Sequence, residues 1–564
     1  MGIVLGIDTG GTFTDAVLWD TNDRRVLRKA KEFTTPDNLA TGIETCIKKM
    51  NLRRQLDLEA VHLSTTLTVN AILEDKFTKL GLILIGRHLS RKLPVQEKYE
   101  ILKDVWSERQ GRVRFSAKDL QPIRKQFAVN YPAVLISAAP TLNQSSECIE
   151  ASAADFLEGY LDTELICCSS ISDNPELYGR TLEAAVTMGL RPELLRWIDS
   201  IQITMGHFGI HAPIRLLTGS GELVPVEQAL DFPLDTILTG PAASYVGSKQ
   251  LSRERNYLLL DIGGTSLDIT KIENGKTRFK KDASVIGNYE FQIRTLDLQS
   301  FATGGDSHIK LNSLGDVTVG PEKVTPLCIL GSRHPHLIHE LFHYRLPDEY
   351  DLCTASETDC YFANIQAPIA GLHRDQLEIV HLLAEKPHSL FYIADHFQKD
   401  ADALHIDQLV KKGYLHCSSL TPTDILHAEG IFHRWDSELA RAGTQLLAAR
   451  KNCGLSEFIS MVKTLIIRQL TFSCMQSIAG FEEKEFLFSD SDATMYLVEK
   501  YLDQQSGLVQ ADFSIQKPIV GVGAPAGSWL PDVAEKLNAK LILPQDGDVA
   551  GAIGAAAAEV RYRQ

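Results

Sequence analysis

One twelve-residue pattern occurs twice in this chain of 564 residues and restricts its fold more than any other feature. The first copy, residues 4–15, reads VLGIDTGGTFTD, and the second, residues 258–269, reads LLLDIGGTSLDI. Each copy has an apolar run, an aspartate, two glycines with a threonine, and a second apolar run, which predicts a strand, a tight turn and a strand. Two copies so far apart indicate two similar lobes rather than a short-period solenoid.

The two turns have the composition of a phosphate site. Glycines let backbone N–H groups approach an anion, hydroxyls add donors, and a neighbouring carboxylate suits Mg²⁺. A glycine hairpin with solvated threonines would explain either copy alone, but two hairpins facing one cleft could clamp the phosphates of one nucleotide. We therefore predict Asp8 and Asp261 as catalytic and magnesium-binding residues. The predicted phosphate-binding residues are Thr9, Gly10, Gly11, Thr12, Gly263, Gly264, Thr265 and Ser266.

The paired hairpins resemble phosphate loops 1 and 2 of the actin, sugar-kinase and Hsp70 superfamily of ATP-dependent proteins. Within that superfamily the chain is similar to the hydantoinase A/5-oxoprolinase family, over roughly residues 1–310 and 421–564. The segments that carry this resemblance are GIDTGGTFTDAV at 6–17, STTLTVNAILE at 64–74, TGPAAS at 239–244, LLLDIGGTSLDI at 258–269 and GVGAPAG at 521–527.

The resemblance implies an α/β fold: two ribonuclease-H-like lobes around an interlobe ATP cleft, with an inserted, mainly helical segment. We expect residues 1–195 to form the first lobe, 196–320 the second, 321–420 the insert, and 421–564 the rest of the second lobe. The small-residue stretches 239–244 and 551–556 would be the two helices that connect the lobes. The turn at 521–527 would receive adenosine on Gly521, Gly523 and Ala524, since a glycine-rich turn leaves backbone free to contact a flat ring; an ordinary strand-to-helix turn is the alternative.

The resemblance further implies an ATP-dependent hydrolase of cyclic amides of the hydantoin or 5-oxoproline type, using ATP and Mg²⁺. The ring carbonyl would be phosphorylated before water opens the ring, with a second, B-type subunit as partner. Related members activate ketones for carboxylation, so a carboxylase-type ATPase subunit is an alternative. A small-molecule kinase and a non-enzymatic, ATP-driven switch would carry the same phosphate loops.

Further polar residues are candidates for substrate contact. Thr65, Thr66 and Asn70 lie where a predicted strand runs into a helix, which suits an anion or a substrate, although a threonine N-cap explains the spacing equally well. Arg180 resembles a family residue and His207 lies in a glycine-rich region, but a surface salt bridge and a structural histidine are the alternatives. A third glycine turn, at 302–307, departs from the family pattern at Asp306, so its role stays open.

The predicted insert contains two patterns of its own. His339, Glu340 and His343 match HExxH, in which two histidines one turn apart bind zinc, so His339 and His343 are candidate zinc ligands. The apolar stripe around them would leave the histidines and Glu340 facing solvent, where they need no metal, and no extended peptidase pattern follows. Three short helices predicted over 375–412 resemble a winged-helix module, but the third is not basic, which favours a packing or partner-contact role over DNA reading.

The composition narrows the class of protein. The formal net charge of −15 argues against a general nucleic-acid binder and against binding to anionic membranes. The ten cysteines form no CxxC pair, so reduced thiols in a cytoplasmic protein are the simplest interpretation. We expect no signal peptide, and no apolar run approaches the roughly 20 residues of a membrane span. The composition leaves a homo-oligomer open.

Overall fold

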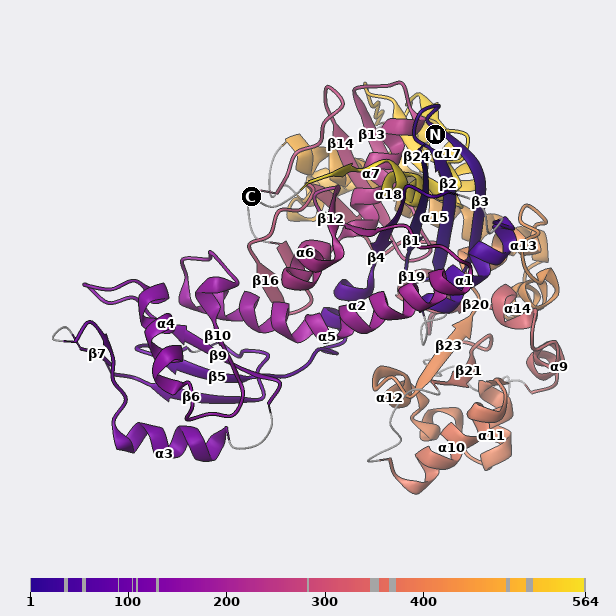
Figure 1. Cartoon of the computed structure of the whole chain (residues 1–564). Helices are drawn as coiled ribbons and strands as arrows, with labels where there is room; N and C mark the ends of the chain where they lie inside the picture. The colour runs from indigo at the N-terminus through magenta and orange to yellow at the C-terminus, as the bar shows by residue number, and fades with distance from the viewer. Residues whose placement is uncertain are drawn as a thin grey trace.

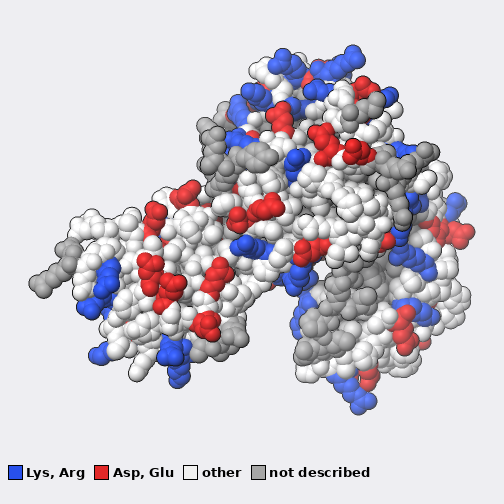
Figure 2. All heavy atoms as spheres, viewed as in Figure 1, with Lys and Arg blue, Asp and Glu red and all other residues white. Residues whose placement is uncertain are grey.

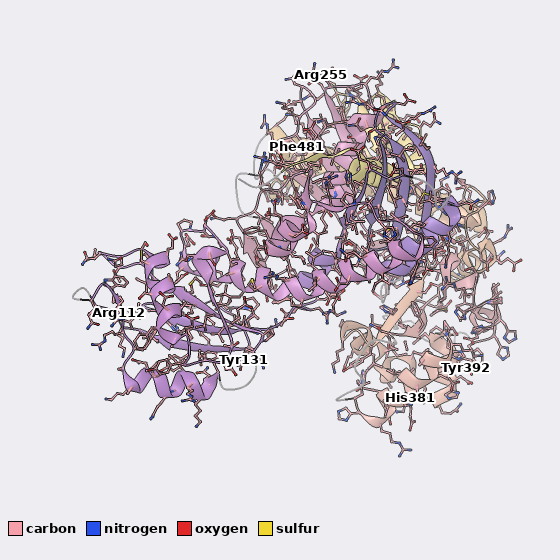
Figure 3. The ribbon with its side chains drawn as sticks, in the orientation of Figure 1. Arg112, Tyr131, Arg255, His381, Tyr392 and Phe481 are labelled. Atoms are coloured by element: carbon pink, nitrogen blue, oxygen red, sulfur yellow. The ribbon has the colours of Figure 1, made fainter. Side chains whose placement is uncertain are left out.

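The chain folds into a two-sheet core, a projecting arm and an insert (Figure 1). The computed structural model describes residues 2–34, 39–52, 57–89, 91–103, 105–107, 110–127, 131–280, 284–344, 355–364, 372–482, 487–503 and 511–561. We use "arm" for residues 81–170 and "insert" for residues 355–419. Figure 3 labels Arg112 and Tyr131 on the arm and His381 and Tyr392 on the insert, at opposite ends of the molecule.

The first core sheet contains the first hairpin. Its strand order is β26 (Glu559–Val560), β12 (Glu222–Pro225), β11 (Ile214–Leu217), β4 (Ala60–Thr65), β1 (Ile3–Thr9), β2 (Phe13–Asp20) and β3 (Arg25–Phe33). Strand β1 runs antiparallel to β2 and parallel to β4, so that Asp8 lies between Asp15 and Ser64. Apolar residues of β1 pack against α1 (Leu39–Met50) and α5 (Leu177–His207) on one face of the sheet and α18 (Ala550–Ala557) on the other.

The second core sheet contains the second hairpin. Its strand order is β17 (Leu298–Phe301), β14 (Leu267–Ile272), β13 (Tyr257–Ile262), β24 (Ile519–Val522) and β25 (Leu541–Ile542). Asp261 lies opposite Asp268 in the antiparallel pair and beside Val522 in the parallel pair. Helices α14 (Ser437–Arg450), α15 (Leu455–Glu482) and α17 (Ala526–Lys536) share one hydrophobic core with this sheet. The two predicted hairpins are therefore confirmed, each within its own sheet.

Helices α7 (Thr239–Leu251) and α18 cross in direct contact between the two sheets. A Cβ added at Gly554 would lie 1.8 Å from the carbonyl oxygen of Ala243, and one at Gly247 would lie 2.0 Å from that of Ala550. Because neither helix could approach so closely with larger side chains, the small residues are required by the packing. The expected close contact of the two small-residue helices is confirmed.

The boundaries of the two lobes differ from those expected. Strands β11 and β12 belong to the first sheet, through pairing of β11 with β4, although residues 196–320 were expected in the second lobe. Helix α18 and strand β26 also return to the first sheet, because β26 pairs with β12. Sheet membership depends on pairing between residues distant in sequence, which the local pattern does not specify.

The arm has a sheet of its own, in the order β10 (Glu164–Cys167), β9 (Ala133–Ala138), β5 (Gly81–Ile85) and β6 (Glu97–Ile101), with all pairs parallel. Its two central strands, β5 and β9, are fully buried and almost entirely apolar, as expected for a parallel sheet covered on both faces. Helices α3 (Ala117–Gln126) and α4 (Ser146–Leu157) and the short hairpin of β7 (Trp106–Ser107) and β8 (Arg112–Val113) complete it. The arm projects from the core at the N-terminal end of α5 (Figure 1).

The insert is mainly helical, as expected, but it begins later than the predicted residue 321, because α8 (Leu327–Gly331) and α9 (His336–His343) pack in the second core. Strands β20 (Thr325–Pro326), β23 (Leu415–Ser419), β21 (Cys360–Ala363) and β22 (His388–Ser389) form a sheet in that order. Helices α10 (Arg374–Glu385), α11 (Leu390–Phe397) and α12 (Ile406–Lys411) enclose a separate core with this sheet. Helix α9 lies between α14 and β22, and so joins the insert to the core.

The remaining elements connect these parts. They are α2 (Leu67–Leu73), α6 (Val226–Asp231), α8 (Leu327–Gly331), α13 (Pro422–Ala428), α16 (Asp492–Asp503), β15 (Ser284–Ile286), β16 (Tyr289–Phe291), β18 (Ser307–Leu311) and β19 (Val317–Lys323).

One helix in the described ranges, α15, is long and apolar enough to cross a membrane by length and composition. Of its most apolar window, 56% is buried inside the protein, and the helix packs in the second core, as core helices of soluble proteins do. The visible face in Figure 2 shows acidic and basic side chains interspersed over the core, arm and insert.

Candidate functional site

A cavity of about 800 Å³ lies between the two core sheets. Strands β1 and β13 each end at its wall, so that both aspartates and both glycine turns meet there. The predicted residues that line it are Asp8, Gly10, Gly11, Thr12, Asp261, Gly263, Gly264, Thr265 and Ser266. Thr9 is fully buried behind this wall. The structure therefore brings together the two hairpins that lie far apart in the sequence.

The two turns have the same internal geometry. Gly10 N–H donates to the carbonyl oxygen of Phe13 at 2.9 Å, and Gly263 N–H donates to that of Ser266 at the same distance. The turns also meet each other, because a Cβ added at Gly264 would lie 2.7 Å from Thr12 Oγ1. Together they form a narrow glycine-rich wall of the cavity.

Carboxyl groups at this wall, on Asp8 and Asp261, and the buried carboxyl group of Asp306 behind it have raised pKa values. Burial raises the pKa of Asp8 to about 6, against a hydrogen bond with Ser64 that lowers it. Burial, with the nearby Asp268 carboxylate, raises the pKa of Asp261 to about 7. Burial also raises the pKa of Asp306 to about 7, although Thr12 Oγ1 donates a hydrogen bond to its Oδ2 at 2.5 Å.

Several of these oxygens are buried without a hydrogen-bond partner among the described residues: Asp8 Oδ1, Asp306 Oδ1 and Thr9 Oγ1. Buried polar atoms are normally satisfied, and closely grouped carboxylates repel each other unless a cation lies between them. Oxygen atoms of this kind are the ligands that Mg²⁺ prefers. The donor set thus fits a magnesium–phosphate group, with the backbone N–H groups of the turns facing the phosphates.

Two lysines contribute positive charge at the same wall. Lys31 Nζ lies 2.6 Å from Asp15 Oδ1 and donates to the carbonyl oxygen of Asp548 at 3.0 Å. Lys323, the last residue of β19, lines the cavity, and burial lowers its pKa, against the attraction of Asp268 and Asp306. Lys323 is therefore a cation within reach of the predicted phosphate region.

The sequence contained a signal for some of the residues that our prediction missed. Asp15 and Asp268 follow Asp8 and Asp261 by seven positions in the two copies of the pattern, and each faces its aspartate across a hairpin. For Lys323 there was no local signal, because only the folding of β18 and β19 against the core brings it to the cavity.

Asp306, which departs from the family pattern, is buried behind the cavity wall, between the two hairpins. Its backbone N–H donates to the carbonyl oxygen of Gly264 at 2.7 Å, which fixes the 302–307 turn against the second hairpin. Through Thr12 it also contacts the first hairpin. Asp306 thus connects both hairpins, which gives a structural role to the residue that differs from the family pattern.

Another wall of the cavity contains Thr65, Thr66 and Asn70. Thr66 N–H donates to the carbonyl oxygen of Thr9 at 3.1 Å, which holds the start of α2 against the first hairpin. Thr66 occupies the N-cap position of α2, but its side chain makes no capping hydrogen bond. Thr65 Oγ1 instead accepts a hydrogen bond from Leu67 N–H at 3.1 Å at the start of this helix, so the structural alternative describes Thr65 but not the Thr66 hydroxyl. Apolar Val69 and Leu73 line the cavity beside them.

Arg180 and His207 are not among the described residues that line the cavity. Arg180 is buried near the arm, where Nη2 donates to the carbonyl oxygen of Ala138 at 2.7 Å and Nε lies 3.5 Å from Glu150 Oε1. His207 is the last residue of α5 and is exposed. The structure gives both residues places outside the cavity, because α5 runs from the arm along the far side of the first sheet (Figure 1).

The glycine-rich turn at 521–527 reaches the cavity only in part. Gly523 and Ala524 line it, whereas Gly521 lies inside β24, where a Cβ would meet Leu530 at 2.3 Å. Gly523 has a φ of +95°, and a Cβ there would lie 2.1 Å from the carbonyl oxygen of Ile262. Only glycine fits this position, so the turn is forced to expose backbone at the cavity.

A segment between α13 and α14, residues 431–435, crosses from the second core sheet to the first. Trp435 stacks on Phe13 with ring centroids 5.2 Å apart and planes 11° apart. Arg434 Nη2 donates to the carbonyl oxygen of Lys31 at 2.7 Å. All five residues of this segment line the cavity, so we call it the strap.

The three HExxH residues do not lie on one face of α9. His339 and His343 are exposed, as expected, and stack with ring centroids 5.1 Å apart. Glu340 is buried on another side of α9, so its expected orientation toward solvent is wrong. The cause is contact with the insert, which adds a second buried face to this short helix.

Comparisons with known proteins identify the family. The model of the hydantoinase/oxoprolinase N-terminal region matches residues 4–126, and that of hydantoinase/oxoprolinase matches residues 180–326. Caprolactamase subunit alpha of Pseudomonas jessenii is 26% identical over 351 residues, which are 56% of this chain and 50% of that protein. Acetophenone carboxylase gamma subunit of Aromatoleum aromaticum is 23% identical over 401 residues, 61% of this chain and 54% of that protein. The chain spans about half the length of these curated relatives.

Two solved structures share the fold. Nucleotide-free acetone carboxylase superposes with a TM-score of 0.62 at 15% identity, over 99% of this chain and 70% of that chain. The ATP-dependent caprolactamase of Pseudomonas jessenii gives a TM-score of 0.58 at 18% identity, over 99% and 71%. With one family model matching each hairpin, and with a caprolactamase subunit similar in sequence, the chain belongs to the hydantoinase/oxoprolinase family.

Proposed function

We propose that this chain binds ATP·Mg²⁺ between its two hairpins and activates the carbonyl group of a cyclic amide of the hydantoin, 5-oxoproline or lactam type for hydrolysis. The observation that carries the proposal is the meeting of both glycine turns and of Asp8 and Asp261 at one cavity. The match to a caprolactamase subunit supports the amide class.

The residues at the wall fit ATP·Mg²⁺. The N–H groups of 10–12 and 263–266 would bind the phosphates, and Asp8 and Asp261 would hold the cation, since their oxygens are buried and closely grouped. Gly523 and Ala524 would contact the adenosine. Bound ATP would supply the phosphoryl group that makes a poor amide electrophile reactive toward water.

The wall formed by Thr65, Thr66, Asn70, Val69 and Leu73 suits a cyclic amide. Hydroxyl and amide groups can bind the substrate's C=O and N–H, while the two apolar side chains contact its ring carbons. Lys323 would offset negative charge at the carbonyl oxygen, because electrostatic positioning contributes most of the catalysis in phosphoryl transfer. Lobe closure through the strap would exclude water from the phosphates.

A B-type subunit is proposed as the partner, because one of the relatives is named as an alpha subunit and another as a gamma subunit. That partner would deliver the water that opens the ring. Activation of a ketone for carboxylation is the second candidate function, and it is favoured by the similarity to acetophenone carboxylase and acetone carboxylase.

The test is phosphate release from ATP by the purified chain, alone and with its B-type partner. The panel contains hydantoin, 5-oxoproline, caprolactam, and acetophenone with bicarbonate. We expect a cyclic amide to raise the rate severalfold, and Asp8→Asn and Asp261→Asn to abolish the increase. Asp23→Asn, an exposed aspartate paired only at the surface with Arg25, is the control.

A rate raised by the ketone with bicarbonate, and by no cyclic amide, would assign the carboxylase alternative. Stable phosphorylation of a panel compound without ring opening would assign a kinase. If ATP binds but no compound changes the rate even with the partner, the amide proposal fails and an ATP-driven switch takes its place.

A further inference from the structure

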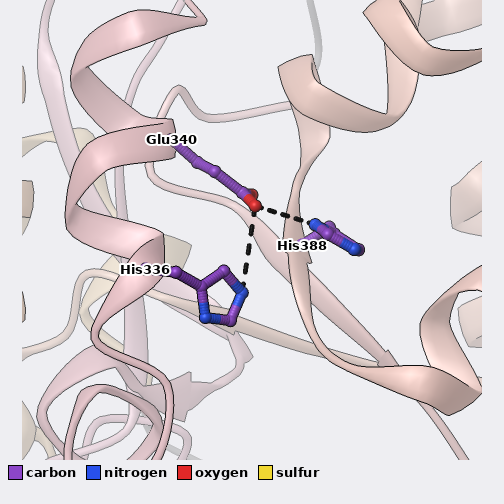
Figure 4. A group of neighbouring side chains, drawn as sticks. All are labelled: His336, Glu340 and His388. Carbon is purple, nitrogen blue, oxygen red and sulfur yellow. Dashed lines mark hydrogen bonds and ion pairs between the residues drawn. The ribbon is translucent and has the colours of Figure 1, made fainter.

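A group of three side chains outside the cavity joins α9 to the insert. His336 and Glu340 stand one turn apart on α9, and His388 comes from β22 (Figure 4). Their nearest ring nitrogen and carboxylate atoms all lie within 4.8 Å of one another. None of the three is part of the cavity lining given above.

The geometry is that of a preformed ligand set. His388 Nδ1 lies 2.8 Å from Glu340 Oε1, and His336 Nε2 lies 3.8 Å from the same oxygen. Ligand atoms around a tetrahedral zinc ion with bonds of about 2.0–2.1 Å are about 3.3 Å apart. The two measured separations lie on either side of that value.

Neighbouring groups hold the ligands in place. Ser389 N–H donates to Glu340 Oε2 at 2.8 Å, which leaves Oε1 to face both histidines. The ring of His388 stacks on Tyr392, with centroids 4.1 Å and planes 7° apart. Supporting contacts of this kind orient the ligands in protein metal sites.

Burial differs among the three ligands. The side chains of His388 and Glu340 are 1% and 7% exposed, whereas that of His336 is 31% exposed. An ion could therefore enter from the His336 side, and a fourth ligand, water or a nearby side chain, could complete its coordination there. Two histidines and a glutamate are a ligand set that Zn²⁺ uses with an open position.

We propose that His336 Nε2, Glu340 Oε1 and His388 Nδ1 bind one divalent cation of the zinc class, and that the ion fixes the insert to the core. Without an ion, hydrogen bonds use the same atoms: His388 Nδ1 to Glu340, and His336 Nε2 to the carbonyl oxygen of Pro387 at 2.9 Å. When the ion binds, His388 Nδ1 and His336 Nε2 lose the protons of these hydrogen bonds, and each nitrogen donates a lone pair to the ion.

This site differs from the HExxH site considered from the sequence. It shares Glu340, but its histidines are His336 and His388 in place of His339 and His343. Because α9 packs on α14 and β22 belongs to the insert, the ion would link two separately packed parts. We expect it to stabilise their relative position, since a ligand that binds only the folded arrangement stabilises it.

The test is titration of the chelator-treated full chain with ZnCl₂ alone, followed by calorimetry and by metal analysis after gel filtration. We expect the wild type to retain about one equivalent of zinc and to unfold at a higher temperature with it. His336→Gln should weaken binding at least about tenfold, as should His388→Gln. His339→Gln/His343→Gln, on the same helix, is the matched control and should bind like the wild type.

His336 is partly exposed, so we expect His336→Gln to fold normally even if a change at buried His388 disturbs the insert. Circular dichroism measures whether each variant is folded. Co²⁺ in place of Zn²⁺ reports the ligands directly, since its visible absorption depends on coordination. Less than about 0.1 equivalent of zinc on the wild type would overturn the proposal. Zinc binding that is unchanged in His336→Gln would also overturn the proposal. The same holds if binding is lost only in the His339→Gln/His343→Gln control.

Discussion

At the scale of single residues, the cavity concentrates negative charge on carboxyl groups that are partly removed from water. Asp8 and Asp261 are half-buried at the ends of β1 and β13, and this desolvation raises the pKa of both. Such an arrangement is costly for the empty protein above neutral pH and becomes favourable when a cation binds. Perturbed carboxyl groups in a cavity are typical of functional sites.

The first prediction concerns Asp261→Asn and pH. Between its ordinary value of 3.8 and about 7, the native carboxyl group holds a proton that the unfolded chain has lost, so native stability falls as pH rises through this range. Asparagine removes this effect. Without nucleotide and Mg²⁺, the stability of the variant relative to the wild type should therefore rise between pH 4 and pH 8. The expected increase in this difference of unfolding free energies is on the order of 3 kcal/mol. Urea unfolding at both pH values measures it, and an equal difference at the two would contradict it.

The second prediction concerns Gly551→Ala at the N-terminal end of α18. A Cβ there would lie 2.0 Å from Asp8 Oδ2, so the aspartate must move or the helix must shift. We expect a loss of stability of about 1–3 kcal/mol, together with loss of ATP-dependent activity. Gly527→Ala in α17, where a Cβ meets nothing within 4 Å, is the control and should change neither. Equal behaviour of both variants in urea unfolding would show that contact with Asp8 is unimportant.

The residues that could be predicted from the sequence are those whose role is local. Asp8, Asp261 and their glycine turns follow from a strand and hairpin pattern that the chain repeats. Lys323 and Asp306 could not be assigned in this way, because their place depends on the contact of 302–307 with the second hairpin. Long-range packing, rather than local pattern, brings Lys323 to the cavity and Asp306 to the position behind its wall.

At the scale of elements, small residues decide how closely α7 and α18 approach. Gly554 and Ala243 meet at the crossing, and the sequence indicated this because both stretches consist of small residues. The insert shows the opposite case. Helix α9 has an apolar stripe that predicts one buried face, but contact with β22 buries Glu340 on another, which periodicity alone cannot indicate.

The third prediction concerns Trp435→Ala in the strap. Trp435 stacks on Phe13, which follows the first glycine turn directly, so its removal should loosen the contact between the two core sheets. We expect a loss of stability of about 1–3 kcal/mol and a nucleotide affinity about tenfold lower. Tyr160→Ala, which removes a stacked ring from Phe156 on the arm, is the control and should leave nucleotide affinity unchanged. Unchanged affinity in Trp435→Ala would show that the strap is not needed for binding.

At the scale of the whole molecule, the sequence predicted two lobes and an insert but not the arm as a separate unit. The arm's central strands, β5 and β9, are apolar runs like those of the core, and only their pairing with each other shows that they form another sheet. The arm and the insert extend from the core on either side of open space (Figure 2). Both are candidate surfaces for the proposed B-type partner.

The central claim is that one nucleotide binds between the two hairpins, and the most direct measurement is calorimetric titration of the full chain with a non-hydrolysable ATP analogue and Mg²⁺. We expect about one site per chain that requires Mg²⁺, with affinity lowered at least about tenfold by Asp8→Asn and equally by Asp261→Asn. Asp23→Asn should bind like the wild type. Absence of binding, or binding that neither hairpin variant weakens, would contradict the account.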